Sequence, residues 1–362
     1  MSVKTITFSA ETNATLCPAF RDYFNHYRHD VQGVKCSYDT SKSLVEKENA
    51  INKAIDAEVN KLTNLNCSSV VERTQYVTNP VYQWATCAVV NKLVDYILPE
   101  IIRDDFMGVA TVDQIGYGDS VDFEIKSNDL FKVVDNGNSR RHVEAQRQFS
   151  GTVTLAPTNH SITVEVDWYR VVARRESLAE YAAKVVLSME NELWVDVMTI
   201  VANSYSSLTT NFKEASFTGN AFTKLSQRVT AANGGAKCVA LGTALGLGVI
   251  LPSDNYLKVG LGERMAEVGY LGRFHDTDLI AIPQRIDWKS ADYDFAIADT
   301  NIYFLSPGAQ RLVRIVLEGD TLTIDSGEFG DANLTRKLTM HKRWATGIVT
   351  NAKYGIMQVA IS

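Results

Sequence analysis

Two segments with the period of β-strands constrain this chain most. In the first, Val121, Phe123 and Ile125 alternate with charged residues, and in the second, at 162–168, apolar residues alternate with polar ones. Successive side chains of a strand point to opposite faces, so each segment has one apolar face and one polar face. Turn-forming residues lie between them. The pattern predicts a long two-stranded arm over residues 119–170.

An isolated two-stranded arm is marginally stable in water, and its open edges favour pairing with another chain. We therefore expect a neighbouring copy of the chain to cover its apolar face. The arginines near its polar tip could form salt bridges to acidic groups of that neighbour, or bind phosphate. The predicted contacts between subunits are Val121, Phe123, Ile125, Asn136, Gly137, Arg140, Arg141 and Trp168.

Three segments have the apolar spacing of amphipathic helices. The first covers residues 41–66, and a second begins at 79–80, where Asn can cap the free amides and Pro fits the first turn. Pro99 is expected to end or kink this second helix. The third helix, 177–205, is the longest, and its apolar residues form two stripes. The first and third helices begin with capping boxes, and the third should contact protein on both sides.

The rest of the chain has short apolar runs that are typical of buried strands. These runs are at 239–241, 249–251, 279–283, 295–298, 302–305, 312–317, 321–324 and 338–357. A helix interrupted by glycines is expected at 253–268. The predicted helices and strands together place the chain in the α+β fold class.

Composition excludes several classes of protein. With 362 residues, 45% hydrophobic and 22% charged, the chain can bury a substantial core. Its net charge of -6 has no clustered basic footprint, so we expect any contact with DNA to be non-specific. No apolar run is long enough to predict a membrane span, and no secretory leader is expected. The five cysteines lack paired spacing, which favours reduced thiols in the cytosol.

No pattern indicates catalysis, a cofactor or a metal. The glycine-rich stretch at 242–248 lacks the Gly-Lys-Ser/Thr ending of a phosphate-binding loop, so we interpret it as a connection between strands. His26 and His29 have no third metal ligand nearby and are expected to be solvated. Acid pairs at 104–105 and 276–278 lie in polar segments, where solvated carboxylates are expected. We predict no catalytic, cofactor-binding or metal residues, and hence no enzyme.

The order of these elements, together with residues 267–283 and their Leu-Gly-Arg-Phe sequence at 271–274, resembles the major capsid proteins of tailed bacteriophages, with the Hong Kong 97 fold. The resemblance implies six parts of the chain. They are an N-terminal arm, 1–80, with a helix near 43–65; a helix and connection, 81–118; an extended hairpin loop, 119–170; a peripheral domain with the spine helix, 171–234; an axial domain, 235–308; and return strands of the peripheral domain, 309–362.

The resemblance also implies a function without an active site. Such a subunit assembles with copies of itself into hexamers and pentamers of an icosahedral shell around packaged double-stranded DNA. Separate scaffold and portal proteins, assembly in the host cytoplasm and a final place in the virion are expected. No cross-linking residue can be assigned. An encapsulin-like compartment that encloses protein cargo is the alternative with the same fold, and an unrecognised enzyme is the alternative of another class.

Overall fold

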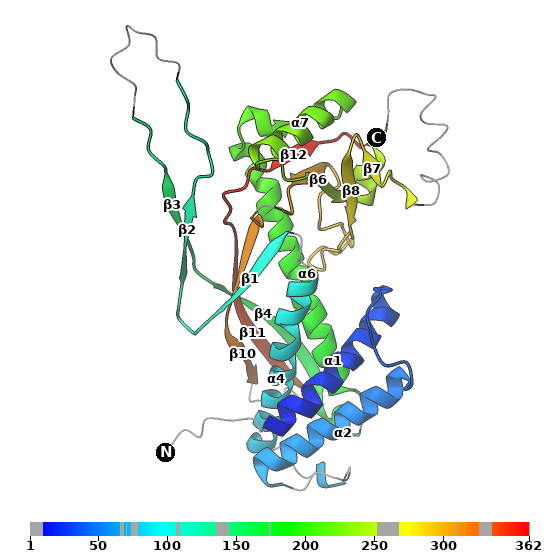
Figure 1. Ribbon diagram of the computed structural model, residues 1–362. Coiled ribbons are helices and arrows are strands. Elements are labelled where there is room, and N and C mark those ends of the chain that lie inside the picture. The colour runs from blue at the N-terminus through cyan, green and yellow to red at the C-terminus, as the bar shows by residue number, and fades with distance from the viewer. Residues whose placement is uncertain are drawn as a thin grey trace.

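The computed structural model describes an elongated molecule with helices at one end, a second sheet at the other and a two-stranded arm beside them (Figure 1). The described residues are 10–65, 69, 71–73, 79–105, 109–134, 145–173, 175–251, 268–308, 310–325 and 335–361. Helices and strands are mixed, which confirms the predicted α+β class.

The main core lies between four helices and one sheet. The helices are α1 (Ala10–Gln32), α2 (Leu44–Thr63), α4 (Pro80–Asp105) and α6 (Leu178–Asn203). α6 contacts all three other helices and also packs against the sheet. Val185 and Met189 of one predicted stripe are buried, at 3% and 1% exposure, and Val186 and Val197 of the other are fully buried. Burial on both sides confirms the prediction made from the two apolar stripes.

Local signals placed the starts of the helices well, but the end or kink expected of α4 at Pro99 is not where the helix ends. Ser43 and Glu46 form the predicted capping box at α2, and the Asn79 side chain accepts a hydrogen bond from the amide of residue 81 at 2.9 Å. At α6 only half of the predicted capping box forms: Ser177 accepts from the amide of Glu180, but the Glu180 carboxylate pairs with Lys184 one turn further on. α4 continues past Pro99 to Asp105, because the neighbours Leu98 and Ile102 are both fully buried and hold the helix in the core.

The N-terminal segment was expected to be an arm with one helix, but α1 is a second, well-buried helix. Phe20 and Phe24 are fully buried in the main core, and Tyr23 is 1% exposed. The expectation of solvated histidines is wrong for His26, which stacks on Tyr38 with ring centroids 4.3 Å apart and a side chain only 13% exposed. Many polar residues dilute the apolar spacing of α1, so its sequence resembled an exposed segment.

The first sheet has the order β1, β10, β11, β4, with bounds β1 (Ala110–Ile115), β10 (Val313–Asp325), β11 (Thr335–Ile348) and β4 (Thr158–Asp167). β1 is parallel to β10, and the other neighbours are antiparallel. The runs predicted at 312–317 and 321–324 form one strand, with a bulge between Glu318 and Leu322.

The pairing predicted for the arm is partly wrong. Residues 162–167 do form a strand, but β4 pairs with β11 in the first sheet, Val164 opposite Leu338. The partner of β2 (Val121–Lys126) is instead β3 (Ser150–Leu155). An alternating pattern predicts the two faces of a strand but not the strand with which it pairs. Val166 of β4 is buried in the first sheet, with 2% of its surface exposed.

The second sheet has the order β5, β12, β9, β6, β8, β7, and α7 (Gly219–Ala232) packs on it. Its strands are β5 (Lys213–Glu214), β12 (Gly355–Gln358), β9 (Asn301–Leu305), β6 (Val239–Thr243), β8 (Thr277–Ile282) and β7 (Arg273–Phe274). Phe222 of α7 contacts the rings of Phe274 and Phe304 in a separate core. The predicted strands at 239–241, 279–283 and 302–305 are confirmed to within two residues at each end.

Other predictions for this region differ from the structure. The short helix α8 (Ala244–Gly248), capped by Thr243, follows β6, so 249–251 is not a strand. At 295–298 there is only an isolated bridge from Phe295 to Ile286. The helix predicted at 253–268 lies, except for its last residue, outside the described residues. β12 pairs with β9, so the end of the chain joins the second sheet, whereas it was expected among the return strands of the first. The domain boundaries stay predictions.

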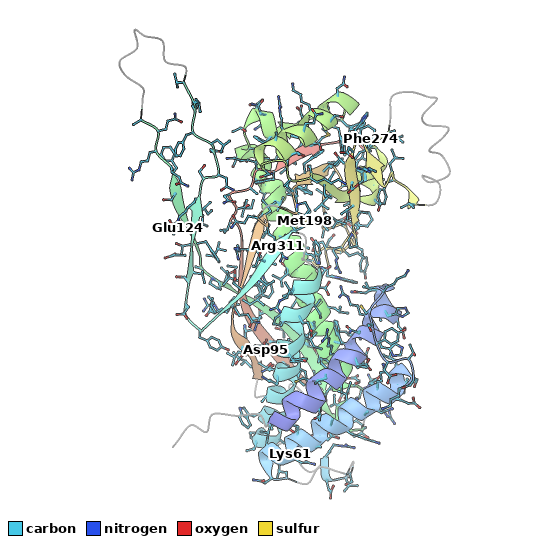
Figure 2. The ribbon with its side chains drawn as sticks, viewed as in Figure 1. Lys61, Asp95, Glu124, Met198, Phe274 and Arg311 are labelled. Atoms are coloured by element: carbon cyan, nitrogen blue, oxygen red, sulfur yellow. The ribbon has the colours of Figure 1, made fainter. Side chains whose placement is uncertain are left out.

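Asp95 connects α4 to the bulge of β10 (Figure 2). Its carboxylate accepts the amide and the hydroxyl of Thr321 and pairs with the ammonium of Lys342 at 2.9 Å. The Lys342 side chain is only 4% exposed. Asp95 therefore neutralises a buried charge.

We predict that Asp95→Ala lowers the free energy of unfolding by about 3–5 kcal/mol, because it leaves the Lys342 ammonium buried without a counter-charge. Urea denaturation measures this loss. The matched control is Lys184→Ala, which removes an exposed ion pair with Glu180 and should cost less than about 1 kcal/mol. Equal, small losses for both variants would contradict the role of Asp95.

Candidate assembly surfaces

The arm consists of β2 and β3, which run antiparallel with Phe123 opposite Val153. In Figure 1 it leaves the body beside the first sheet and extends past the second. Figure 2 shows Glu124 on this arm, away from the body. The alternating burial along β2 confirms one exposed charged face.

The apolar face at the base of the arm packs on the chain itself. Val121, Phe123 and Ile125 are partly buried against a small cluster that includes Leu155 and Val316. The guanidinium of Arg314 lies over the Phe123 ring, 5.4 Å from its centroid. The structure therefore brings three predicted contact residues together, but it turns their face toward the chain's own first sheet. Their contact with a neighbour stays a prediction.

The other predicted contact residues do not form part of a described arm surface. Trp168 begins the short helix α5 (Trp168–Val172) after β4, where the Asp167 side chain accepts the first free amides. Trp168 thus lies in the body of the molecule. Asn136, Gly137, Arg140 and Arg141 lie outside the described residues.

Beyond the paired strands, residues 127–134 and 145–149 continue side by side, and we call them the distal arm. The amide of Lys132 donates to Gln146 Oε1 at 2.6 Å, and Gln146 Nε2 donates to the Lys132 carbonyl at 2.7 Å. Nearer the base, the amide of Ser127 donates to the Phe149 carbonyl at 3.0 Å. The distal arm therefore has a defined shape without a regular ladder.

The distal arm carries the feature that the sequence analysis missed, a group of exposed apolar side chains. They are Leu130, 93% exposed; Phe131, 59%; Val133, 96%; Val134, 41%; and Phe149, 77%. The apolar run at 130–134 was the available signal, but its residues do not alternate, so it did not match a strand with one buried face. Apolar groups gathered at such exposure indicate an interaction surface.

The root of the arm is fixed to the first sheet by Glu318, which is 1% exposed. Its carboxylate accepts the amide of Gly118 at 2.9 Å and pairs with Arg343 at 2.8 Å. Arg343 also donates to the carbonyl of Pro157, which lies between β3 and β4, at 2.9 Å. One glutamate and one arginine thus hold both ends of the arm.

A second attachment lies where the distal arm begins. Asp129 pairs with Lys353 at 3.2 Å, and Asn128 accepts a hydrogen bond from the Asn351 side chain at 3.0 Å. Hydrogen bonding from Ser127 and the Lys353 ammonium lower the pKa of Asp129, so its carboxylate stays charged. Both partners are exposed, so this ion pair guides the arm weakly.

Among the described residues, no group of three or more His, Cys, Asp or Glu side chains could hold a metal ion. No helix in the described part of the chain is both long enough and apolar enough to cross a membrane. The arm instead offers apolar and charged groups that can form contacts with protein.

The family of the chain follows from a comparison with protein-family models. The family described as "SPbeta prophage-derived putative capsid protein YonB" matches residues 30–358. Because the match spans most of the sequence, the chain belongs to this family of capsid proteins. The family confirms the resemblance to phage capsid proteins that the sequence suggested. Among curated proteins, no match was found.

Solved capsid structures are also similar to this chain. For the mature capsid of bacteriophage PhiM1 the identity is 10% and the TM-score 0.46, over 70% of this chain and 86% of that one. For the capsid of cyanophage P-SCSP1u the identity is 12% and the TM-score 0.45, over 71% and 88%. For the capsid of a native GTA particle the identity is 11% and the TM-score 0.44, over 71% and 90%.

The bulge of β10 requires glycine at 319, where φ is +52° and an added Cβ would lie 2.5 Å from the Tyr117 ring. We predict that Gly319→Ala displaces Tyr117, whose hydroxyl donates to the Asp320 carbonyl, and loosens the root. Hydrogen exchange of the amide at residue 118 should then become faster.

Gly33→Ala is the matched control, because Gly33 also has a positive φ, +68°, and an added Cβ would meet nothing within 4 Å, but the residue lies after α1 and not at the root. It introduces backbone strain without the clash. If both variants exchange equally fast at residue 118, contact with Tyr117 does not fix the root.

Proposed function

We propose that this chain is a major capsid protein with a Hong Kong 97-like fold, and that its copies form hexamers and pentamers of an icosahedral shell around double-stranded DNA. Membership in a capsid protein family supports a structural subunit whose place is the virion. The observation that carries the assembly proposal is the distal arm, which is attached at its root and exposes apolar side chains away from the body.

Energetics support contact between copies as the use of this arm. Burying an exposed Val, Leu or Phe side chain contributes about 1.5–3 kcal/mol. Leu130 and Val133 are more than 90% exposed, so almost their whole apolar area is available for burial. The arm and the body are different surfaces, so contacts between them are head-to-tail, and such contacts form rings when the rotation from copy to copy closes. Rings of this kind suit hexamers and pentamers.

The charge of the chain fits a shell that encloses DNA without gripping it. A net charge of -6 favours weak, non-specific contact with phosphates. In this proposal, separate scaffold and portal proteins assist assembly in the host cytoplasm. An encapsulin-like shell would use the same contacts but would contain protein cargo, so the contents of purified particles distinguish the two. For an enzyme, the described surfaces give no specific support.

The test replaces exposed apolar residues of the distal arm in the triple variant Leu130→Ser, Phe131→Ser, Val133→Ser. We expect this variant to remain folded, with a free energy of unfolding within about 0.5 kcal/mol of the unmodified chain, because exposed side chains contribute little to stability. It should fail to form particles in sedimentation velocity and electron microscopy.

The matched control is Val45→Ser with Leu245→Ser, since these residues are also exposed, at 64% and 55%, but lie outside the arm. This control should assemble normally. Particles from the triple variant would contradict the role of the arm. Stable monomers of the unmodified chain under all conditions, including co-expression with the scaffold, would contradict the capsid proposal itself.

A further inference from the structure

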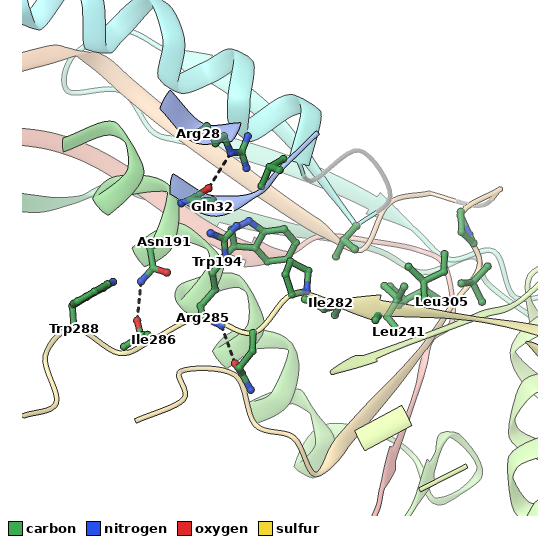
Figure 3. Close-up of a pocket in the computed structure, with 18 residues that line it drawn as sticks. Arg28, Gln32, Asn191, Trp194, Leu241, Ile282, Arg285, Ile286, Trp288 and Leu305 are labelled. Carbon is green, nitrogen blue, oxygen red and sulfur yellow. Dashed lines mark hydrogen bonds between the residues drawn. The ribbon is translucent and has the colours of Figure 1, made fainter. Parts of the chain in front are cut away.

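A pocket of about 640 Å³ lies between α1, α6 and the second sheet (Figure 3). Leu241, Ile282 and Leu305 give it an apolar lining from three strands of that sheet. Trp194 lines it from α6, and Trp288 lies at its edge with its side chain largely exposed. An apolar pocket with aromatic walls is suited to bind an apolar side chain.

The segment that follows β8, residues 283–297, forms one edge of the pocket, and we call it the aromatic loop. Three of its aromatic side chains are exposed: Trp288, 68%; Tyr293, 64%; and Phe295, 65%. The Trp288 and Tyr293 rings meet edge to face with centroids 5.9 Å apart. Asp292 and Asp294 are exposed beside them. The loop also carries Arg285 and Lys289, but these cations pair with Glu190 and Glu192 of α6. Among the described residues Asp292 and Asp294 form no ion pair, so the loop combines apolar area with two uncompensated carboxylates.

The aromatic loop is held in shape before any partner binds. The amide of Asp287 donates to the Asp294 carbonyl at 2.8 Å, and the amide of Ala296 donates to the Arg285 carbonyl at 2.8 Å. Arg285 is tied to α6 by its ion pair with Glu190, also at 2.8 Å. A preformed surface loses little conformational entropy when it binds.

The distal arm complements this surface in both polarity and charge. Its apolar side chains are exposed, and Lys132 and Arg147 are exposed beside them. Among the described residues, neither cation forms an ion pair with a carboxylate of its own chain. The aromatic side chains of the loop can thus contact the apolar side chains of the distal arm. The carboxylates of Asp292 and Asp294 can pair with Lys132 and Arg147.

The two surfaces do not meet within one chain. In Figure 1 the arm lies on one side of α6, whereas β8, which leads into the aromatic loop, lies on the other. Contact between them must therefore join different copies head to tail.

We infer that the pocket and aromatic loop of one copy receive the distal arm of the next copy, with an apolar side chain such as that of Phe131 inserted beside Trp194 and Trp288. This inference rests on the proposed shell function and names the surface that the arm contacts. It places the neighbour's arm against α6, so one interface repeats around each ring.

Disulfide trapping tests the contact directly. Particles are assembled from a mixture of two variants, Val133→Cys and Trp288→Cys, and are then mildly oxidised. We expect cross-linked dimers on non-reducing gels, and a ladder of higher oligomers when both substitutions are in one chain. The control pair is Val133→Cys with Leu245→Cys, whose second position is similarly exposed but lies on α8. Each single variant, oxidised alone, measures the cross-linking that involves the five native cysteines.

Charge reversal gives an independent readout. Lys132→Glu with Arg147→Glu should raise the protein concentration needed for assembly by about tenfold or more, since like charges then face each other across the contact. Adding Asp292→Lys and Asp294→Lys to the same chain should restore assembly toward that of the unmodified protein. The quadruple variant has as many positive and negative side chains as the unmodified chain. Restored assembly would therefore show that these groups pair across the contact.

The outcomes separate the two proposals. Particles that form normally but give no more cross-linking at 288 than at 245, and no recovery on charge exchange, would overturn the pocket contact and leave the shell function intact. A scaffold protein or another partner in the pocket would give this result. An unmodified chain that never forms particles would overturn the shell function and the contact together.

Discussion

The rest of the structure depends on the burial of α6 on both sides. α4 packs along it, β11 of the first sheet contacts it, and the aromatic loop is tied to it through a buried charge. Glu190 is completely buried at this point, and one of its carboxylate oxygens pairs with both Arg28 of α1 and Arg285. Since a buried carboxylate is costly without partners, these ion pairs fix α1 and the aromatic loop relative to α6. The pocket between them is a consequence of that arrangement.

The arm combines two kinds of apolar surface with different uses. At its base, Phe123 and its neighbours pack on the first sheet, while Glu318 and Arg343 hold both ends. These contacts bury the alternating apolar face for which the sequence predicted a neighbouring copy. The exposed side chains of the distal arm remain available, and a fixed root presents them in a defined direction. We therefore assign the contact between copies to residues 127–134 and 145–149 instead of β2.

Local signals in the sequence were sufficient for the starts of α2, α4 and α6, because caps such as Ser43 and Asn79 act within one turn of the residue that carries them. Strand pairing could not be predicted in the same way. β4 alternates as an arm strand would, and only contact with β11, far along the chain, reveals its true neighbour. The pocket could not be predicted either, because the fold brings together Trp194 and Leu305, which are far apart in the sequence. The apolar residues of the distal arm are visible in the sequence, but their exposure to solvent could not be predicted from it.

Electron cryomicroscopy of assembled particles would show which surface each arm contacts. We expect closed rings in which density for the distal arm of one subunit lies in the pocket beside α6 of the next. A particle in which each arm folds back on its own body, or a protein that appears only as discrete monomers, would contradict it.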